Sequence, residues 1–200
     1  MTKQETLPHR VVIAEDSVLL RDGLVRLVES YEFDVCASIG DSEQLLSAVT
    51  NSQPDLVITD VRMPPSYTDE GLQAALKIRA LYSGTPILIL SQYVDERYAA
   101  ELLAGELSGL GYLLKDRVID PTSFIESMRT VTAGGTVIDT EVVQYILRRS
   151  QERAKLERLT PREHEVLGLM AEGKSNAGIS QALTKQPGCR KTCGKCSVKT

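Results

Sequence analysis

Short apolar runs and amphipathic stretches alternate along the first two thirds of the chain. The runs, rich in β-branched residues, are VVIAE at 11–15, DVCASIG at 34–40, DLVITD at 55–60, PILILS at 86–91 and GYLLK at 111–115. Between the first two runs, four aliphatic residues have the spacing of one helix face: Leu20, Leu24, Leu27 and Val28. The pattern predicts an α/β fold, a doubly wound sheet of five parallel strands with helices on both faces.

Capping residues mark further helices in this first part of the chain. Asp41 and Gln44 have the spacing of a capping box, and Asp120 followed by Pro121 begins a helix that Gly134 ends. The residues expected on the inner faces of these two helices are Leu45, Leu46, Val49, Phe124, Ile125 and Met128. We therefore expect a first domain over residues 8–132.

The pattern changes after residue 132. Residues 140–159 have the spacing of one long helix, apolar at first and then highly charged, which predicts a solvated helical linker over 133–158. A Thr-Pro-Arg-Glu start at residues 160–163 begins another helix, whose expected buried face is Val166, Leu167 and Met170. The segment SNAGISQAL at 175–183 follows after a tight turn, so a helix-turn-helix unit is predicted. We expect an incomplete all-α domain over 159–200.

Composition and charge narrow the class of protein. The chain is 42% hydrophobic and 25% charged, which excludes the disordered and fibrous classes. Because no apolar run approaches the roughly 18 residues needed to span a bilayer, and the first ten residues lack a signal-peptide core, we expect a cytoplasmic protein. The net charge of −4 is uneven, since residues 184–200 carry +5 and residues 1–183 therefore sum to −9.

Polar residues stand at the ends of four of the five predicted strands. They are Glu15 and Asp16, Asp60, Ser91 and Lys115. In a flavodoxin-like strand order of 2-1-3-4-5 these side chains converge at one edge of the sheet. Carboxylates this close repel unless a hard cation such as Mg²⁺ lies among them, and one of them could then accept a phosphoryl group. Any one of these residues alone would be an ordinary surface acid or strand cap, but all five together favour a phosphoryl-transfer site.

These segments resemble a known family. VVIAEDSVLLRDGL, DLVITDVRMPP, PILILSQY and GYLLKDR resemble the receiver domain of bacterial two-component response regulators, and LTPREHEVLGLMAEGKSNAGISQAL resembles the LuxR-type output of the NarL/FixJ subclass. The resemblance covers about residues 8–183. It implies that Asp60 is the phosphoacceptor, that Glu15, Asp16, Asp60 and the Arg62 backbone carbonyl hold Mg²⁺, and that Lys115 pairs with the phosphate. It also implies that Ser91 is the switch hydroxyl and Tyr112 the switch aromatic.

The resemblance implies a transcriptional switch with defined partners. A sensor histidine kinase would phosphorylate the receiver, which would then form a homodimer and bind promoter DNA. Two other classes of function stay open: a protein-interaction module that has no DNA output, and a phosphatase of the aspartyl-phosphate type. A phosphatase needs a general acid and a substrate lid, for which no candidate follows Asp60 closely, and turnover of a small phosphate ester would identify one.

The last seventeen residues, TKQPGCRKTCGKCSVKT, do not continue this family pattern with a recognition helix. Pro187 and the scarcity of large aliphatic residues make a third packed helix improbable. Cys189, Cys193 and Cys196 could bind zinc, but only His164 or Cys36 remains as a fourth ligand. The segment could also be a basic arm that contacts phosphates.

A shift of reading frame is the explanation of this tail that we favour. Codons for Gly-Cys-Arg-Lys-Thr-Cys-Gly-Lys-Cys, read one nucleotide later, can encode AVEKHVGN, which is similar to the recognition helix of the output family. An insertion or deletion near Leu183 would then have produced the cysteines and the positive charge. We therefore expect the receiver to be intact and the DNA output of this chain to be impaired.

Overall fold

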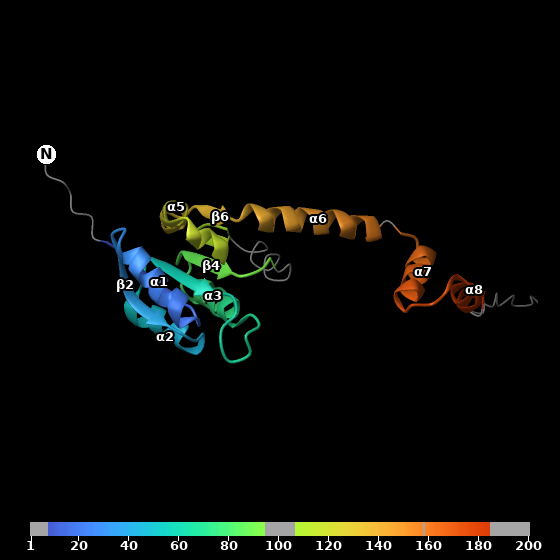
Figure 1. The fold of residues 1–200 in the computed structure, drawn as a ribbon, viewed down its shortest axis with the longest axis horizontal. Coiled ribbons are helices and arrows are strands. Elements are labelled where there is room, and N and C mark those ends of the chain that lie inside the picture. The colour runs from blue at the N-terminus through green and yellow to red at the C-terminus, as the bar shows by residue number, and fades with distance from the viewer. Residues whose placement is uncertain (1–7, 95–106, 158, 185–200) are drawn as a thin grey trace, which may run out of the picture. The chain divides into compact units, whose positions relative to one another are not determined.

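The structure is a computed structural model that describes residues 8–94, 107–157 and 159–184. Contacts divide the chain into two units, Met1–Arg148 and Arg149–Thr200, and each is described by itself. None of the described helices is long and apolar enough to cross a membrane. The elements of the first unit (Figure 1) are β1 (His9–Ala14), α1 (Val18–Glu29), β2 (Phe33–Ile39), α2 (Glu43–Ser52), β3 (Leu56–Asp60), α3 (Glu70–Leu81), β4 (Ile87–Ser91), β5 (Leu110–Leu114), the 3-10 helix η1 (Lys115–Ile119), α5 (Pro121–Thr132), β6 (Thr136–Ile138) and the beginning of α6 (Thr140–Glu157).

The strands form one parallel sheet in the order β2-β1-β3-β4-β5-β6. The predicted order 2-1-3-4-5 is confirmed, but the prediction of five strands was one short. The sixth strand, β6, lies at the start of the predicted linker and pairs with β5, where Ile138 is in register with Tyr112. Three residues after a Gly-Gly pair are too short a run to show the strand period, so the sequence alone did not reveal this strand.

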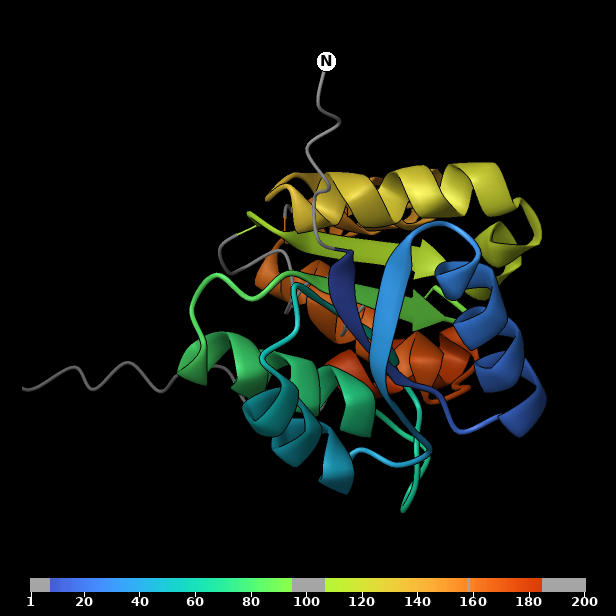
Figure 2. The ribbon, with the colours of Figure 1, turned by 90° about the vertical axis from the view of Figure 1, so that its left-hand side faces the viewer.

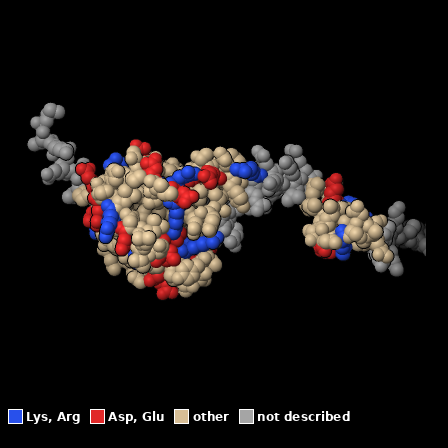
Figure 3. All heavy atoms as spheres, in the orientation of Figure 1, with Lys and Arg blue, Asp and Glu red and all other residues tan. Residues whose placement is uncertain are grey.

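Helices cover both faces of the sheet, as the pattern predicts (Figure 2). One apolar core joins the sheet to α2 and α3, and the other joins it to α1 and α5. The predicted inner-face residues that are buried are Leu24, Val28, Leu45, Val49, Phe124, Ile125 and Met128, while Leu20, Leu27 and Leu46 pack against the cores at their margins. On the face of the molecule in Figure 3, acidic and basic side chains of the first unit are interspersed.

The two capping sites predicted for this unit follow the prediction to different degrees. Asp120 caps α5 as expected, since its carboxylate accepts hydrogen bonds from the backbone N–H groups of Thr122 and Ser123. The carboxylate of Asp41 accepts the backbone N–H of Gln44 at 3.0 Å, but the Gln44 side chain returns to the same carboxylate instead of to the backbone. The N-cap of α2 is Ser42, whose side chain makes no capping hydrogen bond, so of the predicted capping box only the contact from the Gln44 N–H to Asp41 is present.

The second unit holds the predicted helix pair, α7 (Pro161–Ala171) and α8 (Asn176–Thr184). The capping box of Thr160 and Glu163 is present. The prediction that Val166, Leu167 and Met170 form a buried face is wrong, because Leu167 is 43% and Met170 55% exposed, and Val166 is only half-buried. The pattern identifies the apolar face of α7, but within the described part of this unit no third helix covers it. The tail at 185–200, with its three cysteines, lies outside the described residues.

Candidate functional site

The sheet topology brings the predicted strand-end residues to one edge. β1, β3, β4 and β5 are consecutive neighbours in the sheet. Glu15 and Asp16 follow β1, Asp60 ends β3, Ser91 ends β4 and Lys115 follows β5. The carboxyl ends of parallel strands therefore meet here, which is where doubly wound sheets bind ligands.

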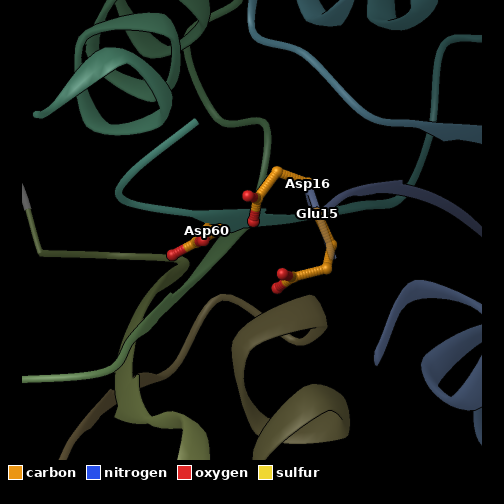
Figure 4. A group of neighbouring side chains, drawn as sticks. All are labelled: Glu15, Asp16 and Asp60. Atoms are coloured by element: carbon orange, nitrogen blue, oxygen red, sulfur yellow. The ribbon is translucent and has the colours of Figure 1, made fainter. Parts of the chain in front are cut away.

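Three carboxylates form the centre of this edge (Figure 4). Glu15 and Asp60 are 1% and 5% exposed, whereas Asp16 is half-buried. One oxygen from each of Glu15, Asp16 and Asp60 can be chosen so that all lie within 4.8 Å of one another. A set of oxygen donors this compact fits a hard divalent cation.

Lys115 supplies the positive charge at the same place. Its Nζ donates to Asp60 Oδ2 at 2.9 Å and lies 2.8 Å from Glu15 Oε2, and the lysine side chain is 17% exposed. The ammonium group therefore bridges acids from two strands that are far apart in sequence. A cation fixed beside Asp60 can also offset the charge of a phosphoryl group placed there.

Burial and charge change the pKa values of these groups. Burial raises the pKa of Glu15 to about 7, and the negative charge of Asp60 adds to this, although Lys115 opposes it. Burial also raises the pKa of Asp60, again against the influence of Lys115. Burial would lower the pKa of Lys115, but hydrogen bonds to Glu15 and Asp60 outweigh it and raise that pKa. Lys115 therefore offsets only part of the free-energy cost of burying these two carboxylates as ions, which favours a second cation.

The two predicted switch residues lie on neighbouring strands. The Ser91 hydroxyl, on a residue that is 5% exposed, donates to the backbone carbonyl of Tyr93 at 2.7 Å. Tyr112 is 2% exposed and belongs to the core between the sheet and the α2–α3 face. Ser91 is thus at the site edge, while Tyr112 lies inside the sheet core.

Arg62 lies next to the cluster. Its backbone N–H donates to Asp60 Oδ1 at 3.3 Å, and its guanidinium lies 6.0 Å from the centre of the Tyr93 ring. The backbone contact between Arg62 and Asp60 is made by the Arg62 N–H group, so a role for the Arg62 carbonyl in metal binding remains a prediction.

Two residues that support the cluster were not found from the sequence. The Arg21 guanidinium on α1 donates to the backbone carbonyl of Glu15 at 2.6 Å and to that of Asp16 at 3.5 Å, and so holds the loop after β1. Gly71, in the first turn of α3, packs against the backbone of Asp60. A glycine inside a helical pattern was the available signal for the second, because it often marks a close backbone approach.

Comparisons with known proteins agree with this geometry. Residues 11–127 match the family model of the response regulator receiver domain, and residues 157–184 match that of bacterial regulatory proteins of the luxR family. The chain is 32% identical to the transcriptional regulatory protein DegU of Brevibacillus brevis (87% of this chain, 79% of that protein) and 31% identical to the oxygen regulatory protein NreC of Staphylococcus epidermidis (87% and 82%). A solved structure of the RcsB response regulator of Salmonella typhimurium has a similar fold, with a TM-score of 0.62 and 23% identity over 90% of this chain and 85% of that one.

Proposed function

This chain belongs to the response regulators that join a receiver domain to a luxR-type helix-turn-helix, and on that premise we propose that Asp60 is its phosphoacceptor. The protein is a phosphorylation-controlled regulator of transcription. The observation that carries the assignment of Asp60 is its position at the end of β3, between the acids that follow β1 and the ammonium of Lys115.

The proposed reaction is a phosphoryl transfer to a carboxylate oxygen. An Asp60 oxygen forms the new bond to phosphorus while the bond between phosphorus and the donor breaks, and its electron pair leaves with the donor. The donor is a histidine nitrogen of a sensor kinase or, in a test tube, the acetate of acetyl phosphate. Lys115 is already within hydrogen-bond distance of Asp60 Oδ2, so it can pair with a phosphoryl oxygen after a small movement.

Glu15, Asp16, Asp60 and the Arg62 backbone carbonyl are the groups that we expect to hold Mg²⁺. Bound there, the ion would supply the second positive charge that the transferring oxygens need. The compact oxygen set supports this, and so do the raised pKa values of Glu15 and Asp60, because burial disfavours their ionised forms and a bound cation would oppose that effect. Glu15 and Asp16 directly follow β1, and the Arg21 guanidinium fixes the loop that carries them.

Ser91 and Tyr112 are the proposed switch residues. The Ser91 hydroxyl can exchange the Tyr93 carbonyl for a phosphoryl oxygen, which would move the end of β4. On the neighbouring strand β5, Leu114 is in register with Ser91, and Tyr112 lies two positions before Leu114. A shift of β4 against β5 would therefore change the packing of Tyr112. We expect Ser91 to act at the phosphoryl group and Tyr112 to respond in the core.

We further propose that three segments of the chain have different roles. Residues 8–132 form the receiver, 133–158 the connecting segment and 159–200 the output. The partners are a sensor histidine kinase, a second copy of the chain after phosphorylation, and promoter DNA in the family design. RcsB, whose fold this chain shares, has been solved in complex with DNA. We expect the protein to act in the cytoplasm, where its DNA is, and as a switch rather than as an enzyme that turns over small phosphate esters.

DNA reading by this chain is proposed to be weak. The match to the luxR family ends at residue 184, where the tail begins that the family pattern does not explain. A frame shift near Leu183 would account both for the end of the family match and for the sequence of the tail. If the tail is instead native, a receiver that signals through protein contacts becomes the better description.

The assignment of Asp60 is tested by mass spectrometry after treatment with acetyl phosphate and Mg²⁺. The wild-type chain is expected to gain one phosphoryl group, and Asp60→Asn is expected to gain none. Asp22→Asn, an exposed acid on α1, is the matched control and should react like wild type. An undiminished adduct on Asp60→Asn would overturn the assignment, and a reaction that is unchanged when EDTA replaces Mg²⁺ would overturn the metal requirement.

A further inference from the structure

A third buried acid, Asp139, lies outside the phosphoryl site, between β6 and α6. Its side chain is 1% exposed. The carboxylate accepts a two-pronged contact from the Arg117 guanidinium, with Nε 2.7 Å from Oδ2 and Nη2 3.0 Å from Oδ1. Paired, parallel hydrogen bonds of this kind fix the orientation of both groups as well as their separation.

This carboxylate also holds the segment that carries Lys115. Asp139 Oδ2 accepts the backbone N–H of Leu114 at 3.4 Å, and Arg117 is two residues after Lys115. Asp139 therefore contacts the chain on both sides of the lysine. In addition, the Asp139 backbone N–H donates to the carbonyl of Tyr112 at 2.8 Å, which ties the same residue to β5.

The same residue begins the connecting helix. Asp139 Oδ1 accepts the backbone N–H of Glu141 at 3.0 Å, and the Asp139 carbonyl accepts that of Val143 at 3.1 Å, so Asp139 is the N-cap of α6. Val142, in the first turn, is buried in the core between the sheet and the α2–α3 face. The start of α6 is thus fixed to the receiver through the acid that also fixes the turn after β5.

We propose that Asp139 and Arg117 form a positioning pair that holds Lys115 toward Asp60 and links the phosphoryl site to the first turn of α6. The inference rests on the proposed function of Asp60. When Lys115 shifts from Glu15 and Asp60 to a phosphoryl oxygen, the turn that carries it moves against Asp139, and the cap of α6 moves with it. Because such linkage is reciprocal, disturbing the cap also disturbs Lys115.

The electrostatics of the pair are consistent with this rigid role. Burial would raise the pKa of Asp139, but the Arg117 guanidinium and the backbone N–H groups of Glu141 and Leu114 outweigh it and lower that pKa. Asp139 therefore remains charged, and its contact with Arg117 is retained. The other carboxylate beside Arg117, that of Glu141, is 61% exposed and 2.7 Å from Nη2.

This difference between the two carboxylates gives a matched set of variants of the full chain. Asp139→Asn keeps the size and the capping ability of the residue but removes the charge that orients Arg117. Arg117→Lys keeps the charge and loses the paired contact. Glu141→Gln removes the exposed partner of the same arginine and serves as the control.

The first measurement is the rate of Asp60 phosphorylation by acetyl phosphate in Mg²⁺, resolved into the maximal rate constant and the acetyl phosphate concentration that gives half of that rate. Asp139→Asn is expected to lower the maximal rate constant by at least about five-fold with little change in the half-saturating concentration, and Arg117→Lys to lower it less. Glu141→Gln should match wild type. Far-ultraviolet circular dichroism identifies any variant that fails to fold, and Arg117→Lys, which retains the buried charge pair, then carries the test.

The second measurement is hydrogen exchange at the amides of Glu141 and Val143, with and without beryllofluoride as a phosphoryl mimic. In wild type, exchange is expected to change on addition of the mimic, and in Asp139→Asn this response should be lost. An Asp139→Asn variant with the maximal rate constant and the exchange response of wild type would overturn the inference, as would a Glu141→Gln variant that is equally impaired. If wild type itself is not phosphorylated at Asp60, the proposed function fails, which is a different result.

Discussion

Gly71 lies so close to Asp60 that a Cβ atom on residue 71 would be 1.7 Å from the Asp60 carbonyl oxygen and 2.9 Å from Thr59 Oγ1. The Gly71 backbone N–H donates to the carbonyl of Val61 at 3.0 Å. The first turn of α3 therefore packs directly on the backbone that carries the proposed phosphoacceptor. The atoms in the way belong mainly to the main chain, so they cannot move aside as a flexible side chain would.

We predict that Gly71→Ala lowers both stability and phosphorylation. Inserting a methyl group against fixed backbone costs about 1–3 kcal/mol or more, and the displacement of Asp60 is expected to slow its reaction with acetyl phosphate by up to about 100-fold. Gly23→Ala on α1 is the control, because a Cβ there meets nothing within 4 Å. Alanine at that position should stabilise the helix by roughly 0.5–1 kcal/mol. Thermal unfolding and the phosphorylation rate check both variants, and a Gly71→Ala protein that matches Gly23→Ala would contradict the prediction.

Glu15 makes the metal-free protein sensitive to pH. Its pKa is raised from 4.5 to about 7, so the folded state binds the proton more tightly than the unfolded state. The stability linked to this group is fully present below about pH 4.5 and is lost as pH rises through about 7. The loss amounts to roughly 3 kcal/mol, and the raised pKa of Asp60 adds to it with the same sign.

We therefore predict that Glu15→Gln flattens the fall in stability between these two pH values. Urea unfolding in EDTA, compared between wild type and Glu15→Gln across this range, measures the effect. Mg²⁺ requires the ionised carboxylate, so its affinity for wild type should rise with pH and level off above about pH 7. If the stability difference between the two proteins were independent of pH, the raised pKa of Glu15 would be excluded.

The chemical residues at the strand ends could be predicted from the sequence because each is marked locally. Glu15, Asp60 and Lys115 each stand at the end of a short apolar run, and parallel topology then brings such ends together. The roles of Arg21 and Asp139 have no such local mark, and the role of Gly71 has only the weak one of a glycine inside a helical pattern. They depend on which backbone atoms lie within reach once the helices are packed, and the sequence spacing does not contain this information.

In the second unit the sequence pattern predicted burial that the structure does not show. The period of α7 identifies Leu167 and Met170 as an apolar face, and the structure leaves them exposed. A hydrophobic period indicates which side of a helix is apolar but does not provide the element that covers it. A prediction of burial therefore fails wherever the covering element is absent from the pattern.

Dimerisation is predicted to depend on phosphorylation of Asp60. Ser91 and Tyr112 lie on β4 and β5, so a change at Asp60 reaches that edge of the sheet most directly. We expect the contact surface to involve β5, α5 and the fourth helix, the last of which lies outside the described residues. Sedimentation velocity should show a shift from monomer to dimer on adding beryllofluoride and Mg²⁺ to wild type, and no shift with Asp60→Asn. A wild-type profile that does not change would rule out this form of the switch.

The last prediction concerns DNA, which this chain is expected to bind weakly and without sequence preference. Base reading requires a docked helix that directs side chains to base edges. Within the described part of the second unit, α7 and α8 leave Leu167 and Met170 uncovered, as they would if the helix that follows them in the family design were missing. The remaining affinity should come from the five basic residues after Leu183. It should then fall with salt by a slope of at most about 4.5 in log units.

A competition assay distinguishes sequence-specific from non-specific DNA binding by this chain. A palindromic site of the family type and a scrambled duplex compete for this chain and for a protein whose reading frame is restored after Leu183. We expect no preference with this chain and a clear preference with the restored protein, because the restored sequence after Leu183 would be similar to the recognition helix of the output family. If this chain already prefers the palindrome by about 100-fold or more, specific recognition is intact. The tail would then have to supply base contacts itself, and the frame-shift explanation and the impaired output would both be wrong.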